Sequence, residues 1–453
     1  MRQQRSASAL ALGLCAIAML AGCPGGKVAP GGGGDSYSPY PPPYPTYDSG
    51  LPPGVDGSIN PPPPSCSQPA TISGKVFAPN GTDPVPNASV SVRTTPPDPF
   101  PAQVACELCS NNNTAGALMQ IKSGFDGSFS LSGVCPGNVQ IVLQNGRFRR
   151  VLPLAVTAGA TIALPPDQTR LPRRNAERDP SDSVPKIAVA TGDYDQMECV
   201  LKRMGLDDDQ IEIFDATSHY GAPPTGPSFS QLLADLNRMK QYSVIFINCG
   251  NAIGSLLAQP QVRTNVGEYV RSGGRLYVTD LSYDWIEQIP ELASALDFEP
   301  GPSAPTQPEP MGAASVGAGG LIVDATVKDQ QLAQWLGLFP GAIANGRTRI
   351  EHFSEGWAMM HQATTNTKVW VEGQVNGQGI FGVRPLTVTF NFNNCGKILF
   401  SSYHTASTGY GNPYGPTPGL PLSQRCSQQP LSPQERILEY LIFDIANCVR
   451  PIQ

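Results

Sequence analysis

Catalytic signatures, positive charge and long apolar runs are all scarce in this sequence. No HExxH, GxSxG or phosphate-cradling glycine loop occurs, so the motif-based hydrolase and nucleotide-binding chemistries are not indicated. Lys and Arg number 30 against 36 Asp and Glu, and an acidic chain repels the phosphates of nucleic acid. The apolar run at residues 9–20 is shorter than the roughly 20 residues that a membrane-spanning helix needs.

The N-terminus has the parts of an export signal. Arg2 and Arg5 precede the apolar run, and Ala and Gly stand at positions 21 and 22 before Cys23. This ending resembles the lipobox of bacterial lipoproteins, in which the chain is cut before the cysteine and the cysteine carries the lipid. The resemblance implies a signal peptide over 1–22 and a membrane anchor at Cys23; an ordinary secretory peptide is the alternative. Pro24, where an Asp would retain the protein at the inner membrane, favours the outer membrane.

The cysteines indicate an oxidised protein. Of eleven cysteines, Cys15 lies in the signal and Cys23 at the anchor, and the nine that remain should mostly pair outside the cytosol. Because nine is odd, at least one is free or pairs between molecules. One CxxC spacing occurs, without a second CxxC or a nearby histidine, so zinc or redox chemistry is less favoured than a disulfide framework made from Cys66, Cys106, Cys109 and Cys135.

Two parts precede the main domain. Residues 23–65 hold the anchor and a Pro/Gly-rich stretch without an apolar period, which predicts a disordered spacer. Residues 66–165 alternate apolar and polar residues at 71–77, 88–92, 128–131, 139–143 and 161–164, between Gly, Pro and Asn turns. Short alternating strands of this kind predict a β-sandwich.

The motifs at 72–76, 85–90 and 124–131 resemble the carboxypeptidase regulatory-like family. That family is a prealbumin-like sandwich without catalytic residues, so the resemblance implies a structural or spacer module rather than a peptidase. An insertion at 94–120 departs from its simplest members.

Residues 166–184 read as a polar linker, and 185–453 change period. Apolar runs at 186–190, 211–214, 242–247 and 275–280 alternate with helical patterns. This rhythm predicts a doubly wound, flavodoxin-like parallel sheet with a β-rich insertion at 301–392. A capped helix starts at Ser432, after a strand at 397–404. Because a crossover helix ends near the start of its strand, we predict a Cys395–Cys448 disulfide.

Residues 244–250, 269–276 and 396–404 resemble the class I glutamine amidotransferase-like superfamily, nearest to its trehalose-utilisation-type members. Catalytic members place a cysteine on the turn after the strand that ends here at Thr279, but positions 280–282 contain none. Cys249 lies one strand earlier without a neighbouring histidine, and a Cys199–Cys249 disulfide is preferred over a free thiol. His404 matches a strand-end histidine of the superfamily.

Ligands of open α/β sheets bind at the carboxyl ends of the strands. That edge should collect six candidate ligand-binding residues: Asp193, Asp195, Asn248, Asp280, Asp284 and His404. They suit a polar or metal pocket, or they are simply helix caps and polar loop residues. His219, His352 and His361 fit no constellation, and no cofactor is indicated.

The missing nucleophile favours a non-catalytic envelope lipoprotein that either has a structural role or binds a small polar ligand, a glycan or a partner protein. The alternative is an envelope hydrolase that uses Asp280, His404 or a bound metal ion. Composition excludes neither, so catalysis stays an open question at this point.

Overall fold

The computed structural model describes residues 64–108, 116–216, 226–250, 253–300, 310–351, 353, 356–364, 366–405 and 421–449. The signal peptide, Cys23, nearly all of the 23–65 segment, Cys109, His219 and His352 lie outside these residues. Among the helices that are described, none has both the length and the apolar character needed to cross a membrane.

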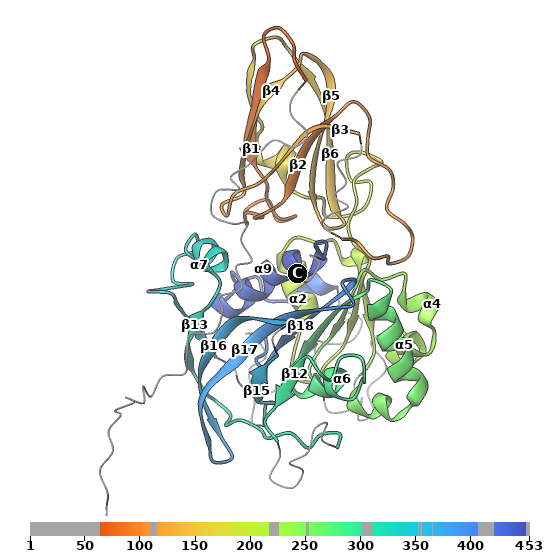
Figure 1. The fold of residues 1–453 in the computed structure, drawn as a ribbon, viewed down its shortest axis with the longest axis vertical. Helices are drawn as coiled ribbons and strands as arrows, with labels where there is room; N and C mark the ends of the chain where they lie inside the picture. The colour runs from red at the N-terminus through yellow and green to blue at the C-terminus, as the bar shows by residue number, and fades with distance from the viewer. Residues whose placement is uncertain are drawn as a thin grey trace, which may run out of the picture. The chain divides into compact units, whose positions relative to one another are not determined.

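The first described part is β-rich, as expected (Figure 1). One sheet has the order β4 (Ser128–Val134), β1 (Ala70–Lys75), β7 (Thr161–Ala163), and a second has the order β3 (Ala117–Lys122), β2 (Ser89–Arg93), β5 (Gly137–Asn145), β6 (Phe148–Val156). Alternation fixes the inward faces: Phe129 and Leu131 of β4 are buried, whereas Ser128 and Ser130 are exposed. Sequence alternation did not indicate β6, because its adjacent Arg149 and Arg150 break the apolar period although both are buried.

The segment 166–184 is packed against β6 rather than extended as a linker. It begins with α1 (Pro166–Thr169) and brings two carboxylates to the buried arginines. Glu177 lies 2.5 Å from Arg150 and 2.8 Å from Arg170, and Asp182 forms a further ion pair with Arg150. Charges that resemble a solvated linker in the sequence therefore neutralise a buried basic pair.

The second part is α/β and contains a nine-stranded mixed sheet. Its parallel portion has the order β18 (Gly396–Ser401), β11 (Arg275–Thr279), β10 (Val244–Ile247), β8 (Ile187–Ala190), β9 (Ile211–Phe214). Strands β8, β10 and β11 are buried along their whole length, which explains their unbroken apolar sequences.

The predicted β-rich insertion extends this same sheet. Antiparallel strands continue outward from β18 in the order β17 (Ile380–Phe392), β16 (Thr367–Gly377), β13 (Val323–Val327), β14 (Arg347–Ile350). A separate two-stranded pair joins β12 (Leu296–Phe298) and β15 (Met360–Ala363).

Helices cover both faces of the parallel strands (Figure 1). Neighbouring residues of β8 therefore lie in different cores. Val189 packs in the core that includes α2 (Met197–Arg203) and α9 (Pro433–Ala446). Ala188 packs in the core that includes α3 (Phe229–Ala234) and α5 (Pro260–Arg271). The remaining helical segments are η2 (Asp208–Gln210), α4 (Leu236–Met239), η3 (Ile253–Ala258), η4 (Asp280–Tyr283), α6 (Asp284–Glu287), α7 (Gln330–Leu336) and α8 (Leu422–Arg425). The predicted start of α9 is confirmed, because Ser432 and Glu435 form a reciprocal capping box.

Both specific disulfide predictions are wrong. Cys395 pairs with Cys106 rather than with Cys448, which is itself disulfide-bonded. The cause is a segment that lies along the end of α9: the Val449 N–H donates to the carbonyl of Glu107 over 2.8 Å, which brings Cys106 beside the start of β18.

Cys199 pairs with Cys426 rather than with Cys249. Helix α2 contacts α8, so Cys199 faces the residue that follows α8 instead of the end of β10. Cys66 and Cys135 are joined, in line with the predicted framework. Cys249 is a buried free thiol, and the odd cysteine count had required at least one cysteine without an intramolecular partner.

The Glu177 ion pairs predict a loss of stability in acid. Burial raises the pKa of Glu177, but hydrogen bonds and charges from Arg170 and Arg150 outweigh it and lower the pKa from 4.5 to about 2. A depressed pKa in the folded state stabilises the protein above pH 4.5, and this contribution disappears as the pH falls towards 2. Urea unfolding should therefore show Glu177→Gln costing clearly more at about pH 6 than at about pH 3. Glu268→Gln, which breaks an exposed ion pair with Arg271, is the control. An equal cost of Glu177→Gln at both pH values would contradict the assignment.

Candidate functional site

The loops after β8, β10, β11 and β18 meet at the carboxyl edge of the parallel strands. Register explains why they meet: Ile247 lies opposite Val278, and Thr279 lies opposite Ser401, so the next residues of each strand leave the sheet side by side. The edge gathers the side chains of Cys249, Asp280 and His404, whose donor atoms all lie within 4.8 Å of one another.

Asp280 occupies a sharp turn between β11 and η4. Its φ is +44°, an uncommon value for a residue that is not glycine, and its side chain is fully buried. The Ala358 N–H donates to Oδ1 over 2.7 Å, and Nε2 of His404 lies 2.7 Å from Oδ2. Both carboxylate oxygens are therefore engaged by the protein itself.

The environment of His404 favours its protonated form relative to a free imidazole. Burial lowers the pKa of the imidazole, but the charge and hydrogen bond of Asp280, helped by the charge of Asp195, outweigh burial and raise the pKa above 6.5. The ring of Tyr194 stacks near that of His404, with centroids 6.2 Å apart. Residues that follow β8, β11 and β18 therefore together fix the orientation of the His404 ring relative to Asp280.

Cys249 belongs to this cluster, and sequence reasoning missed it by assigning it to a disulfide. Its Sγ lies 3.7 Å from Oδ2 of Asp280. Burial, followed by the negative charge of Asp280, raises the pKa of the Cys249 thiol well above its usual value. A protonated, buried thiol is a poor nucleophile. The odd cysteine count was the one sequence signal that could have identified a free thiol here.

Two further candidates support the cluster from its side. Oδ1 of Asp195 accepts hydrogen bonds from the N–H and the hydroxyl of Thr405, at 3.0 and 2.7 Å, directly after His404. The amide of Asn248 donates to Glu198 over 3.0 Å, and Arg425 lies 3.4 Å from the same carboxylate. Burial raises the pKa of Glu198, a buried acid that the sequence analysis did not select.

The other two candidates lie at the same edge but do not join the cluster. Asp193 is half-buried beside Gly250. Asp284, in α6, accepts a hydrogen bond from the Gly312 N–H over 3.0 Å. His361 lies elsewhere, on β15, where its imidazole is 2.9 Å from Glu299.

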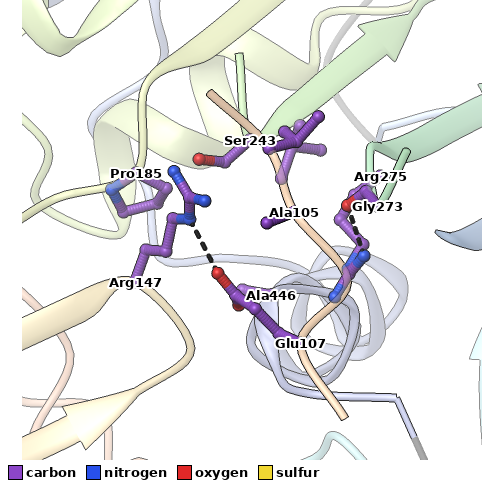
Figure 2. A pocket seen from close by; sticks show the side chains of 10 residues that line it. Ala105, Glu107, Arg147, Pro185, Ser243, Gly273, Arg275 and Ala446 are labelled. Carbon is purple, nitrogen blue, oxygen red and sulfur yellow. Dashed lines mark hydrogen bonds and ion pairs between the residues drawn. The ribbon is translucent and has the colours of Figure 1, made fainter. Parts of the chain in front are cut away.

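Figure 2 shows a pocket at the opposite edge of the sheet, where β10 and β11 begin. Arg147 and Glu107, 3.1 Å apart, lie on one side of it, and Ser243 and Arg275 are among the other residues that line it. Its volume of about 10 Å³ is at the lower limit for a single water molecule, so it cannot hold an organic ligand. A wider hollow of about 380 Å³ shares Arg147 and Ser243, and it too lies at the amino edge rather than beside the cluster.

No family model matches the chain, and no curated protein matches it. Similar solved structures include a ThuA-like protein from Parabacteroides merdae, with 12% identity over 54% of this chain and 91% of that one, at a TM-score of 0.29. They also include a GMP synthase subunit from Thermoplasma acidophilum, with 9% identity over 51% and 90% of the two chains, at a TM-score of 0.28. PurLQS from Thermotoga maritima has 12% identity over 48% and 84%, at a TM-score of 0.27. Amidotransferase-like proteins are thus among the structural neighbours, but scores this low carry no conclusion about function.

Loss of the Asp280 carboxylate should strongly destabilise the protein. Asp280→Ala leaves His404 and the Ala358 N–H without their acceptor, and removing one member of a buried ion pair costs about 3–5 kcal/mol. The control is Asp209→Ala, which removes an exposed carboxylate and should cost about 0.5 kcal/mol or less. Equal free energies of unfolding for the two variants would show that Asp280 is not a structural centre.

Proposed function

We propose that this chain is a lipid-anchored protein of the bacterial cell envelope, on the outer membrane, and that it binds a ligand rather than catalyses a reaction. The anchor rests on Cys23 and its preceding export signal. The disulfides Cys66–Cys135, Cys106–Cys395 and Cys199–Cys426 support an oxidising compartment, where such bonds persist.

We further infer a prealbumin-like sandwich followed by a flavodoxin-like domain. The two sheets of the β-rich part contribute to one buried core, which supports a sandwich. In chain order within the α/β part, the parallel strands lie 2-1-3-4-5, which is the flavodoxin-like order. In this assignment the sandwich is a spacer module, and the α/β domain carries the ligand site.

The full engagement of Asp280 carries the non-catalytic proposal. Asp280 stands on the turn where catalytic members of the resembled superfamily place their cysteine. A nucleophile must offer a free electron pair to an incoming substrate. The carboxylate of Asp280 is not accessible to a substrate, because the side chain is fully buried and its two oxygens already contact the Ala358 N–H and His404. The ligand would be a small polar molecule, a glycan or a partner protein, and not nucleic acid.

The hydrolase alternative has one observation in its favour. An acid on a strained turn beside a histidine is a pairing that covalent catalysis uses. This alternative requires the Asp280–His404 contact to open when substrate binds.

The anchor can be tested by labelling and fractionation. The full chain should incorporate labelled palmitate and sediment with membranes, because two or more acyl chains hold a protein stably. Cys23→Ser should abolish both properties, whereas Cys15→Ser, a cysteine within the predicted signal, should leave both intact. An unlabelled, water-soluble wild-type chain would refute the anchor.

Catalysis can be tested with an ester and glycan hydrolysis screen on the mature chain carrying Cys23→Ser. We expect rates no higher than those of matched Asp280→Ala and His404→Ala proteins, because the wild-type carboxylate is not available to substrate. Hydrolysis by the parent that disappears in both variants would establish the hydrolase instead. Circular dichroism of each variant checks that a lost activity is not lost folding.

A further inference from the structure

We propose that Cys249, Asp280 and His404 bind one transition-metal ion of the zinc type. The three residues follow neighbouring strands, β10, β11 and β18, and converge from three separate loops. Asp280 Oδ2 is the common point, 2.7 Å from Nε2 of His404 and 3.7 Å from Sγ of Cys249. This proposal is independent of the membrane anchor and of whether the protein is an enzyme.

The spacing of the donor atoms suits a metal ion. Zinc takes nitrogen and oxygen at about 2.0–2.2 Å and sulfur at about 2.3 Å, so neighbouring ligand atoms around it lie roughly 3–4 Å apart. The three atoms here lie within 4.8 Å of one another. The separation of 3.7 Å between Cys249 and Asp280 falls in this range, and the contact of 2.7 Å between His404 and Asp280 would have to lengthen slightly to admit the ion.

The local charge also calls for a cation. Asp195 and Asp280 are both buried at this edge, and Oδ2 of Asp195 has no hydrogen-bond partner among the described residues. Arg425 pairs with Glu198, and the imidazole of His404 lies beside Asp280. Buried carboxylates are costly unless they are paired or coordinate a metal, and a divalent ion would balance both.

Outer contacts hold the ligands in place, as they do in established metal sites. The Ala358 N–H fixes Oδ1 of Asp280 and leaves Oδ2 turned towards His404 and Cys249. Asp195 binds Thr405, the residue next to His404, through two hydrogen bonds. Ala358 belongs to the insertion, and Asp195 follows β8. The ligands themselves follow β10, β11 and β18, so other parts of the domain hold them in position.

The donor set selects the kind of ion. A thiolate with an imidazole suits zinc, cobalt or iron, whereas calcium and magnesium prefer all-oxygen sites. Three protein ligands leave one position of a tetrahedral ion for water. All three side chains are buried, so the ion would be taken up as the protein folds and would join the ends of three strands.

The test uses the full mature chain with Cys23→Ser, produced in medium containing Zn²⁺ or Co²⁺ alone. We expect about one ion per purified chain, and for the cobalt protein a near-ultraviolet thiolate-to-metal absorption band. Cys249→Ser should abolish the band, and His404→Gln should lower metal content by about tenfold or more. The control is His361→Gln, which removes a histidine that pairs with Glu299 outside the cluster and should change neither reading.

Several outcomes overturn the proposal. The wild-type chain could emerge metal-free from both media and show no change in melting temperature when the metal alone is added. It could bind the ion without a thiolate band, or keep the band in Cys249→Ser, and then the ion lies elsewhere. If the variants do not fold, the cobalt spectrum of the wild type still decides. Hydrolysis by the metal-loaded wild type would overturn the non-catalytic proposal while leaving the metal site standing.

Discussion

The carboxylate of Asp280 is the contact on which the carboxyl edge of the sheet depends. It receives the Ala358 N–H from the insertion, the imidazole of His404 after β18 and the thiol of Cys249 after β10. Without a partner, this group would be a fully buried anion, which is among the most unfavourable states for a protein side chain. The loops of three strands and the insertion are therefore arranged around one charge, and the tight turn at residue 280 is maintained by the contacts that satisfy it.

Several other buried charged residues in the described part of the protein are also paired with residues of opposite charge. Charged residues make up only 15% of the sequence, yet several of them are buried in defined pairs. Arg150 with Asp182, and Glu439 with Arg436, lie within the structure rather than on its surface. Burial raises the pKa of Glu439 well above its ordinary value, and the charge of Asp83 adds to this effect. Ion pairs of this kind add little net stability but strongly penalise any arrangement that separates the partners, so they specify which segments meet.

Most of the secondary structure could be predicted, because it follows from patterns among neighbouring residues. The disulfide partners could not be predicted, because residues near a cysteine in the sequence do not show which distant cysteine it will meet. The alternation in β4, the unbroken apolar runs of β8 and β10 and the capping box at Ser432 all follow from neighbouring residues. The topology rule for parallel sheets then placed Asp280 and His404 at one edge.

Disulfide pairing depends instead on which distant segments pack together, and no spacing rule could show that the loop holding Cys106 lies along α9. The role of Cys249 was missed for the same reason, because an assumed partner concealed its contact with Asp280. Strand β6 escaped notice because its buried arginines read as surface residues until their partners at 177 and 182 are known.

The long sequence separation of Cys106 and Cys395 has a consequence for how the disulfides form during folding. Its two cysteines are 289 positions apart, whereas Cys66 and Cys135 are only 69 apart. Along the chain, Cys66, Cys109 and Cys135 all lie nearer to Cys106 than Cys395 does. If the thiols oxidise before the α/β part has folded, Cys106 would pair with one of these nearer cysteines, and thiol–disulfide exchange would then have to replace that bond. Oxidative refolding of the reduced protein should therefore depend more on thiol–disulfide exchange than on the strength of the oxidant.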